Sequence, residues 1–158
     1  MAELRRTILL IAYACLMSIP VAAHDDEKPL SIKVSWKANA SRSVLEFEIS
    51  NRSDEAIILG ESSLPWKDRH SIVIIGATKS KGALASTYPI RDRFFERQVA
   101  IKPGEVLKGN VNLEHFISHF TQALSQSEIL IFWSYEPKTH QGVALGHYGG
   151  QLSTGQRM

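Results

Sequence analysis

Two stretches near the start of the chain alternate between apolar and polar residues, as a strand does when only one face is buried. In Leu30–Ala38 the apolar positions are Ile32, Val34 and Trp36. In Ser43–Ser50 they are Leu45, Phe47 and Ile49. Successive side chains of a strand point to opposite faces, so each stretch predicts a strand with one wet face. The short polar turn at 39–42 predicts that the two strands form a hairpin.

Another stretch, Glu128–Pro137, is apolar at nearly every position. As a strand, it would place these residues on one face: Ile129, Ile131, Trp133 and Tyr135. Leu130 and Phe132 would lie on the other face. A strand that is apolar on both faces is typical of a central strand covered on two sides. We therefore expect the rest of the chain to pack around this strand.

Further short apolar segments are separated by turn residues. Strands are expected at Ala56–Leu59, Ser71–Gly76, Gln98–Lys102, Glu105–Leu113 and Gly149–Leu152, with a short edge strand near Ala83–Ala85. The continuous apolar run of Ser71–Gly76 predicts a buried strand. One helix is predicted at Glu114–Leu124, capped by Asn112, with apolar residues at helical spacing on one face. We expect this helix to cover the side of the central strand that carries Leu130 and Phe132.

The strands follow one another without helices to make parallel crossovers. This order favours an all-β protein. The sequence thus predicts an antiparallel immunoglobulin-like β-sandwich of seven to eight strands with one short connecting helix.

The first residues have the pattern of a secretory signal peptide. Arg5 and Arg6 precede the apolar run Ile8–Met17, and small residues follow, with Val21 and Ala23 at the positions read by a signal peptidase. We expect cleavage after Ala23 and a periplasmic or secreted protein. The predicted organisation is a signal peptide at 1–23, a polar segment at 24–29, a β-sandwich domain at 30–153 and a frayed end at 154–158.

Charge and cysteine content narrow the classes of partner. The formal net charge of the 158-residue chain is only +2, so nothing points to nucleic acid or to an anionic membrane surface. The only cysteine, Cys15, lies within the predicted signal peptide. The exported domain is therefore expected to fold without a disulfide, by burial of its core alone.

Several segments together resemble small exported immunoglobulin-like domains, modules that accompany secreted bacterial proteins and some secreted metalloproteases. These segments are Leu45–Ser53, Ile101–Glu105, Val111–Leu113 and Phe132–Tyr135. The resemblance rests on residues that build a sandwich. It therefore implies a fold and no particular activity.

His24 is the sharpest candidate for chemistry. Cleavage after Ala23 would make it the first residue, and its α-amine and imidazole could then bind one metal ion together. A second histidine, His140, His147 or His70, would complete a nitrogen site of the kind that Cu(II) prefers. This arrangement resembles the histidine brace of lytic polysaccharide monooxygenases, and periplasmic copper carriers also place an N-terminal histidine on a β-sandwich. The alternative is a solvated terminal histidine with no ligand.

Two further histidines, His115 and His119, lie four residues apart on the predicted helix. At that spacing they share one side and could hold a metal ion. The sequence between them lacks the glutamate of a zinc protease helix. The alternative is a pair of polar residues beside the apolar face of the helix.

Aromatic and arginine side chains mark candidate partner-binding positions. Trp66 follows a proline in a predicted loop, and Arg93, Phe94 and Arg97 combine an aromatic ring with guanidinium groups, a composition enriched at protein interfaces. The alternative is that the phenylalanine belongs to the core and the charges are solvated.

No nucleophile elbow, glycine-rich phosphate loop or pair of carboxylates placed for acid–base work appears in the sequence. We therefore expect a non-catalytic binding module that is exported and recognises a protein or another envelope component. The alternative function is copper binding through His24, with His140 or His147 as the second ligand.

Overall fold

The computed structural model describes residues 28–39, 42–78, 82–86 and 97–155. Every strand pair in this part of the chain is antiparallel. A three-stranded sheet has the order β1-β2-β7. Its strands are β1 (Leu30–Asn39), β2 (Arg42–Asn51) and β7 (Val106–Asn112).

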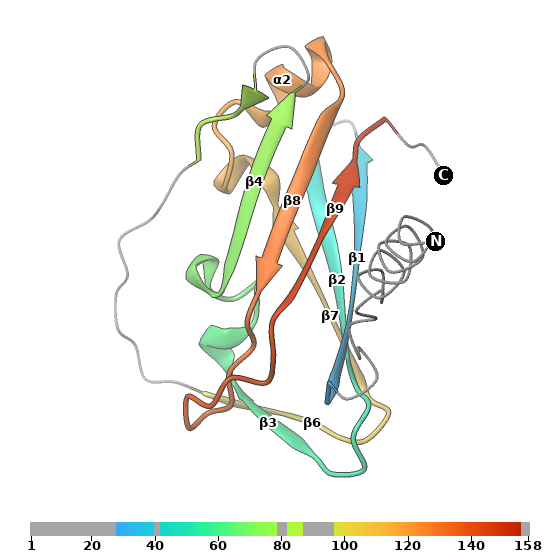
Figure 1. Cartoon of the computed structure of the whole chain (residues 1–158), viewed down its shortest axis with the longest axis vertical. Helices are drawn as coiled ribbons and strands as arrows, with labels where there is room; N and C mark the ends of the chain where they lie inside the picture. The colour runs from blue at the N-terminus through green and yellow to red at the C-terminus, as the bar shows by residue number, and fades with distance from the viewer. Residues whose placement is uncertain (1–27, 40–41, 79–81, 87–96, 156–158) are drawn as a thin grey trace, which may run out of the picture.

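A four-stranded sheet has the order β5-β4-β8-β9. Its strands are β5 (Gly82–Ala83), β4 (Ile72–Thr78), β8 (Ile129–Tyr135) and β9 (Tyr148–Ser153). A separate two-stranded ribbon, drawn across the lower end of Figure 1, joins β3 (Ile57–Gly60) to β6 (Gln98–Ile101). The protein is thus all-β and antiparallel, as predicted.

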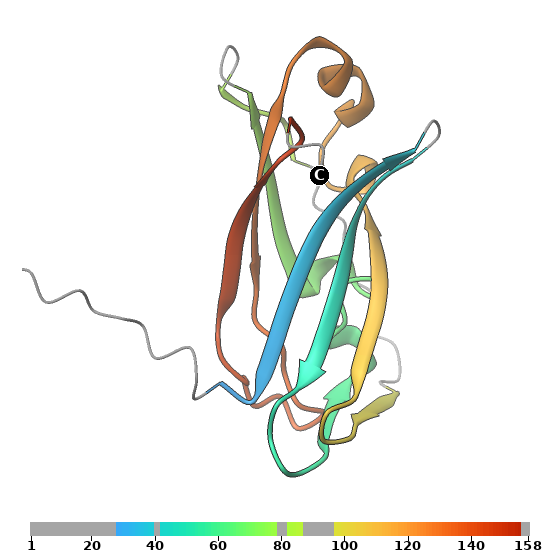
Figure 2. The same ribbon diagram turned by 90° about the vertical axis from the view of Figure 1, so that its right-hand side faces the viewer.

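The two larger sheets lie face to face with the core between them (Figure 2). Leu45, Phe47 and Ile49 of β2 are fully buried, and so are Ile129 and Ile131 of β8. Burying one such side chain contributes about 1.5–3 kcal/mol. The rings of Phe47 and Trp133 meet edge to face across the layers, with centroids 6.0 Å apart. The alternation seen in the sequence of β2 therefore supplies the inner face of the three-stranded sheet, and every second apolar residue of β8 supplies that of the four-stranded sheet.

The predicted hairpin at the start of the domain is confirmed. Leu30 pairs with Asn51, and the register runs without interruption to the pair of Asn39 and Arg42. Asn51 is buried, yet its amide is fully used: Nδ2 donates to the carbonyl oxygens of Glu55 and Ile101, and Oδ1 accepts from the Ser53 amide. A buried amide is stable only when it is bonded in this way. The turn after β2 is therefore fixed by one side chain.

The expectation of a central strand covered on both sides is only half right. β8 does pair with a strand on each edge, β4 and β9. Its outer face, however, faces solvent: Phe132 is 40% exposed, and on β4 Val73 is 45% and Ile75 is 39% exposed. Ser71–Gly76 is accordingly not a fully buried strand.

The reason lies in where the helix sits. α2 (Phe120–Gln126) lies beyond the ends of β4 and β8, at the top of Figure 1. Its Phe120 packs edge to face on Trp36 of β1, with ring centroids 5.8 Å apart. The helix thus closes one end of the core and leaves the outer face of the four-stranded sheet uncovered.

The helix predicted at Glu114–Leu124 is confirmed only in its second half, which is α2; its first half is not part of that helix. Asn112 does cap a helix, accepting from the Glu114 amide at 3.1 Å, but that helix is the 3-10 turn η4 (Leu113–His115). The Ser118 amide then donates to the carbonyl of Ala85, and His119 is left-handed with φ 56°. Docking of this segment beside the β5 region breaks the helix. His115 and His119 therefore do not share a helix face, which removes the basis for the paired metal site.

Nine strands are present in the described residues, against the seven to eight expected. The expected edge strand near Ala83–Ala85 is the two-residue strand β5. The segment between β3 and β4, predicted as a loop, contains two 3-10 turns, η2 (Glu61–Ser63) and η3 (Arg69–Ser71). Within the described ranges, no helix is long and apolar enough to cross a membrane.

Candidate functional site

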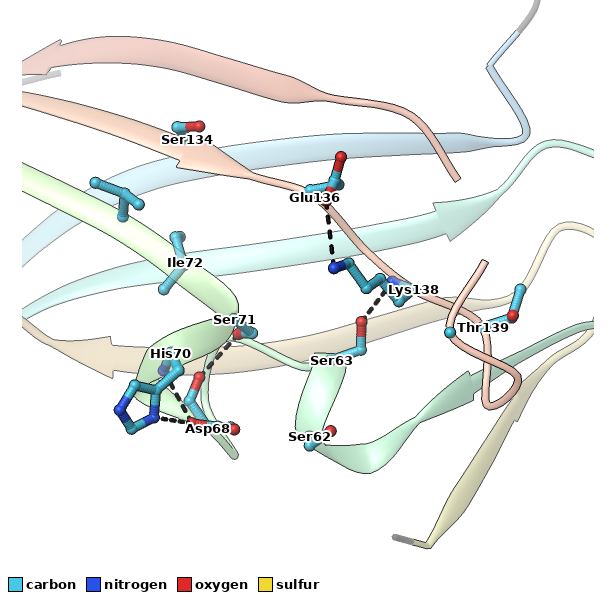
Figure 3. A pocket seen from close by; sticks show the side chains of 12 residues that line it. Ser62, Ser63, Asp68, His70, Ser71, Ile72, Ser134, Glu136, Lys138 and Thr139 are labelled. Carbon is cyan, nitrogen blue, oxygen red and sulfur yellow. Dashed lines mark hydrogen bonds and ion pairs between the residues drawn. The ribbon is translucent and has the colours of Figure 1, made fainter. Parts of the chain in front are cut away.

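A polar hollow of about 360 Å³ opens at one end of the four-stranded sheet (Figure 3). Two stretches of chain form it: the 3-10 turns before β4, and the loop that follows β8. Its lining is rich in hydroxyl and charged groups: Ser62, Ser63, Asp68, His70, Ser71, Ile72, Val73, Ser134, Glu136, Lys138, Thr139 and Gly142. We call this site the polar hollow.

Asp68 organises the side of the hollow next to β4. Its carboxylate accepts from the backbone amide of His70 at 2.8 Å and so caps η3. The same Oδ1 lies 2.9 Å from Nδ1 of the His70 ring. If Nδ1 carries the proton in this contact, the neutral ring presents Nε2 as an acceptor. The Ser71 hydroxyl donates to the Asp68 carbonyl at 2.8 Å, which fixes the turn.

Ser63 ties the two stretches of the hollow together. Its carbonyl accepts from the Tyr135 hydroxyl at 2.9 Å, and its hydroxyl oxygen accepts from the Lys138 amide at 2.6 Å. Tyr135 is 1% exposed. Burial raises the pKa of the Tyr135 phenol, and the hydrogen bond to Ser63 only partly offsets this effect. The phenol therefore stays protonated and remains a donor at neutral pH.

The rim of the hollow carries paired polar groups. The Lys138 ammonium lies 3.5 Å from the Glu136 carboxylate, an exposed pair that contributes little stability. The hydroxyl of Ser134 lies 3.2 Å from Nε2 of His147. The hollow thus offers hydroxyls, two carboxylates and an ammonium group for hydrogen bonding, and hydrogen bonds within its lining hold these groups in place.

An apolar strip adjoins the hollow on the outer face of the four-stranded sheet. Ile75 of β4 pairs with Phe132 of β8, and Val73 lies two residues along β4 from Ile75. Val73 also lines the hollow, so the strip and the hollow are continuous. These residues are apolar in the sequence, and their pattern predicts that they are buried. Only the position of α2 shows that they are exposed.

The structure describes His70, His140 and His147, three of the four histidines predicted as ligands of a copper site. His140 and His147 lie in the loop after β8, and His70 lies across the hollow on η3. The ring nitrogen Nδ1 of His140 is buried and has no hydrogen-bond partner within the described residues. No group of three or more histidine, cysteine, aspartate or glutamate residues in that part of the chain could hold a metal ion. His24 lies outside the described ranges, so the copper site stays a prediction.

Only two of the four predicted partner-binding residues, Trp66 and Arg97, lie in the described part of the chain. Trp66 is half-buried and packs against the core, with its indole over Gly109 of β7. Arg97 is exposed, and its carbonyl accepts from the Glu61 amide at 2.7 Å. Arg93 and Phe94 lie outside the residues that the structure describes. Binding of a partner by these four residues therefore stays a prediction.

Comparison with known proteins adds little. No family model matches the chain, and no curated protein matches it. Among solved structures it is similar to a protein from Archaeoglobus fulgidus, at 11% identity and a TM-score of 0.38, over 81% of this chain and 97% of that one. It is also similar to a β-glucosidase from Kluyveromyces marxianus in complex with glucose, at 11% identity and a TM-score of 0.29, over 80% of this chain and 14% of that one. Likenesses this weak carry no argument about fold or function.

Proposed function

We propose that this chain is an exported, non-catalytic binding module of the cell envelope or periplasm, and that its partner is another protein. One observation carries the proposal: Val73, Ile75 and Phe132 form an exposed apolar strip beside the polar hollow. Contiguous apolar residues on a surface, with polar groups around them, are typical of interaction sites. The proposed partner docks on the outer face of the four-stranded sheet.

The composition of this face favours a protein partner. Protein interfaces combine an apolar centre that contains aromatic side chains with a hydrogen-bonding rim. Here Phe132 and its neighbours supply the centre, while Ser134, Glu136 and Lys138 supply the rim. The near-neutral chain offers no broad charged field that would favour a polyanion.

The bonding in the hollow supports binding without chemistry. Asp68 caps η3, the Ser71 hydroxyl is bonded to the backbone, and Ser63 accepts from Tyr135 and Lys138. Groups that hold one another in place form a preorganised surface, which lowers the entropic cost of binding.

We also propose that the architecture is an immunoglobulin-like sandwich. The support is topological: two antiparallel sheets of order β1-β2-β7 and β5-β4-β8-β9 enclose one core. In immunoglobulin-type domains the first, second and fifth strands share one sheet and the third, sixth and seventh share the other. When β3 and β6 are left out of the count, β1, β2 and β7 take the first set of places and β4, β8 and β9 take the second. Here β3 and β6 depart from that scheme by forming a separate ribbon.

A photo-cross-linking experiment in the native host tests the docking face. A benzophenone amino acid placed at Ile75 is expected to capture one envelope protein, and Phe132→Ser in the same chain is expected to abolish that product. Val106 on β7 is the matched control, because it is also an exposed aliphatic residue, 42% exposed against 39% for Ile75. The same product from position 106, or a product that survives Phe132→Ser in a folded variant, would overturn the proposal.

Copper binding is the second candidate function. The observation in its favour is the buried Nδ1 of His140, which lacks a hydrogen-bond partner in the described part of the chain. A buried polar atom without a partner is costly, and coordination of a metal ion would satisfy it. The remaining ligands would be the amine and imidazole of His24, with His147 in the same loop as His140.

A further inference from the structure

One edge of the four-stranded sheet is open. The sheet ends with β9, on the side of β8 away from β4 (Figure 1). The Thr154 amide donates to the Ile129 carbonyl at 3.0 Å and continues the ladder between β9 and β8. Because successive residues of a strand direct their backbone groups to opposite edges, the N–H and C=O groups of Gly149, Gln151 and Ser153 point away from β8. Among the described residues, none bonds to these groups.

This open edge is accessible to another chain. Gly149, Gly150 and Gln151 are all exposed. The nearest strand of the other sheet, β1, forms its ladder with β2 alone. The backbone groups of β9 that point away from β8 are therefore available for one more strand.

β9 also lacks the features that usually keep a sheet edge from pairing. These features are charged side chains, proline, a bulge or a very short strand. Each of the other three end strands of the two larger sheets has one: β1 carries Lys33 and Lys37, β7 carries Lys108, and β5 is two residues long. β9 has six residues without a charge or a proline, and its pairing with β8 has no bulge. An edge of this kind is a template for strand addition.

We propose that β9 pairs with β9 of a second copy of this chain, antiparallel and around a two-fold axis, so that the two four-stranded sheets become one. A two-fold contact requires a surface that is complementary to itself. A register centred on Gln151 meets this requirement and uses all three residues whose backbone groups point outward. Gln151 then lies opposite Gln151 of the second copy, and Gly149 lies opposite Ser153.

The side chains of β9 fit this register. The two carboxamides at 151 can hydrogen-bond to each other, because each has a donor and an acceptor. On the other face, Leu152 lies opposite Gly150 of the second copy, so a large side chain meets a position that has none. No like charges are brought together, since β9 carries no charge. This match favours a second copy of the chain over a strand of an unrelated protein.

The inference does not rest on the proposed docking face, because it uses the backbone edge of β9 and none of the residues of the apolar strip. The two features are nevertheless compatible. A two-fold axis between antiparallel strands of one sheet is perpendicular to that sheet. The dimer would therefore present both apolar strips on the same side.

The test measures self-association of the protein purified from the envelope fraction. Sedimentation equilibrium is expected to show a molar mass that rises from one chain to two with concentration. Gln151→Pro is expected to weaken the dimer at least about tenfold, because proline removes the amide that donates across the axis in each copy. The fold is expected to survive, since this amide does not bond to β8. Circular dichroism and the Tm of the variant check that point.

Asn110→Pro is the matched control. Asn110 is an exposed residue of β7, an end strand of the other sheet. In the ladder between β7 and β2, the Asn51 amide donates to the Glu105 carbonyl at 3.1 Å, so by the same alternation the Asn110 amide points away from β2. This substitution is expected to leave self-association unchanged.

A charge exchange tests the register without proline. Gln151→Lys and Gln151→Glu each place like charges opposite each other at the axis, and each is expected to weaken self-association about threefold. An equimolar mixture of the two variants is expected to associate at least as tightly as the wild type. Phe132→Ser, on the apolar strip, is expected to leave the dimer intact.

Four results would refute the proposal. They are a wild-type chain that stays monomeric at its highest soluble concentration, a dimer that folded Gln151→Pro does not weaken, a mixture of Gln151→Lys and Gln151→Glu no tighter than either alone, and a dimer abolished by Phe132→Ser. The last result would assign self-association to the outer face of the sheet instead of its edge.

Discussion

Single residues decide how closely neighbouring segments of this protein approach each other. Gly109 of β7 faces the core next to Phe47, and the Trp66 indole occupies the space that a side chain at 109 would fill. A Cβ built on Gly109 would lie 1.9 Å from Cδ2 of Trp66, closer than any real contact. The sequence shows both residues but cannot show that they are in contact, because they lie 43 positions apart and only the tertiary structure brings them together.

Gly109→Ala is accordingly expected to lower the free energy of unfolding by about 1–3 kcal/mol, since a rigid ring must move to admit the methyl group. Urea denaturation measures the effect. In a Trp66→Ala background the same substitution should cost little, and Asn110→Ala, an exposed position on the same strand, serves as the control. An equal cost of Gly109→Ala in both backgrounds would show that Trp66 is not the obstacle.

For the histidines, too, the sequence shows the residues but not their contacts. Their number and spacing are visible in the sequence, and His140 and His147 do lie in one loop as their separation implies. Which ring nitrogen is bonded, however, depends on residues far away in the chain. Ser134 lies beside Nε2 of His147, whereas Nδ1 of His140 is buried without a partner in the described residues.

At the scale of elements, strands were easier to predict than the helix. A strand with one buried face has a period of two, and β1 and β2 carry it within about two residues of their observed ends. The helical spacing at Glu114–Leu124 was misleading, because Phe116 and Phe120 are both buried although a left-handed residue separates their turns. The spacing of apolar residues reflects which residues are buried, and two short helical turns can bury the same residues as one continuous helix.

Glu114 joins those two turns. Its carboxylate accepts from the Thr121 amide in the first turn of α2 at 2.6 Å, and this hydrogen bond lowers the pKa of Glu114. A lowered pKa in the folded state means that the charge stabilises the fold above the ordinary glutamate pKa. That stabilisation is lost as the pH falls through the lowered value.

Glu114→Gln is therefore expected to lower the free energy of unfolding by about 0.5 kcal/mol at pH 7, with the difference from wild type shrinking toward zero in strong acid. Chemical denaturation between pH 7 and pH 3 measures it. Glu55→Gln, at an exposed position in the turn after β2, is the control. A difference that does not change with pH would mean that the charge of Glu114 is not the cause.

At the scale of the whole molecule, the proposed roles require export and two sheets that enclose one core. The described strands run from Leu30 to Ser153. The signal peptide and His24 lie outside the described residues, so export and the maturation site stay predictions. The copper alternative depends on that site, because only a chain that begins at His24 offers the α-amine beside its imidazole.

Protein recovered from the envelope fraction is expected to begin at His24, as measured by N-terminal sequencing or intact mass. If it also binds copper, His24→Ala and His140→Ala should each weaken Cu(II) binding by at least about tenfold, whereas His115→Ala, an exposed histidine outside the loop, should not. A different mature N-terminus, or unchanged affinity in His24→Ala, would end the copper hypothesis.

The sequence by itself determined the all-β class, the antiparallel order, the first hairpin and the inner faces of β1 and β2. The hairpin and those faces follow from the local alternation of apolar and polar residues, and the antiparallel order follows from strands that succeed one another without helices between them. Only the tertiary structure decided which apolar face stays exposed, where the helix breaks, which side chains gather at the polar hollow and which sheet edge stays open. The outer face of a sheet is buried only if an element from elsewhere in the chain packs against it. Here α2 closes the end of the core instead of covering Phe132. Local periodicity records that a residue is apolar; the path of the whole chain decides what covers it.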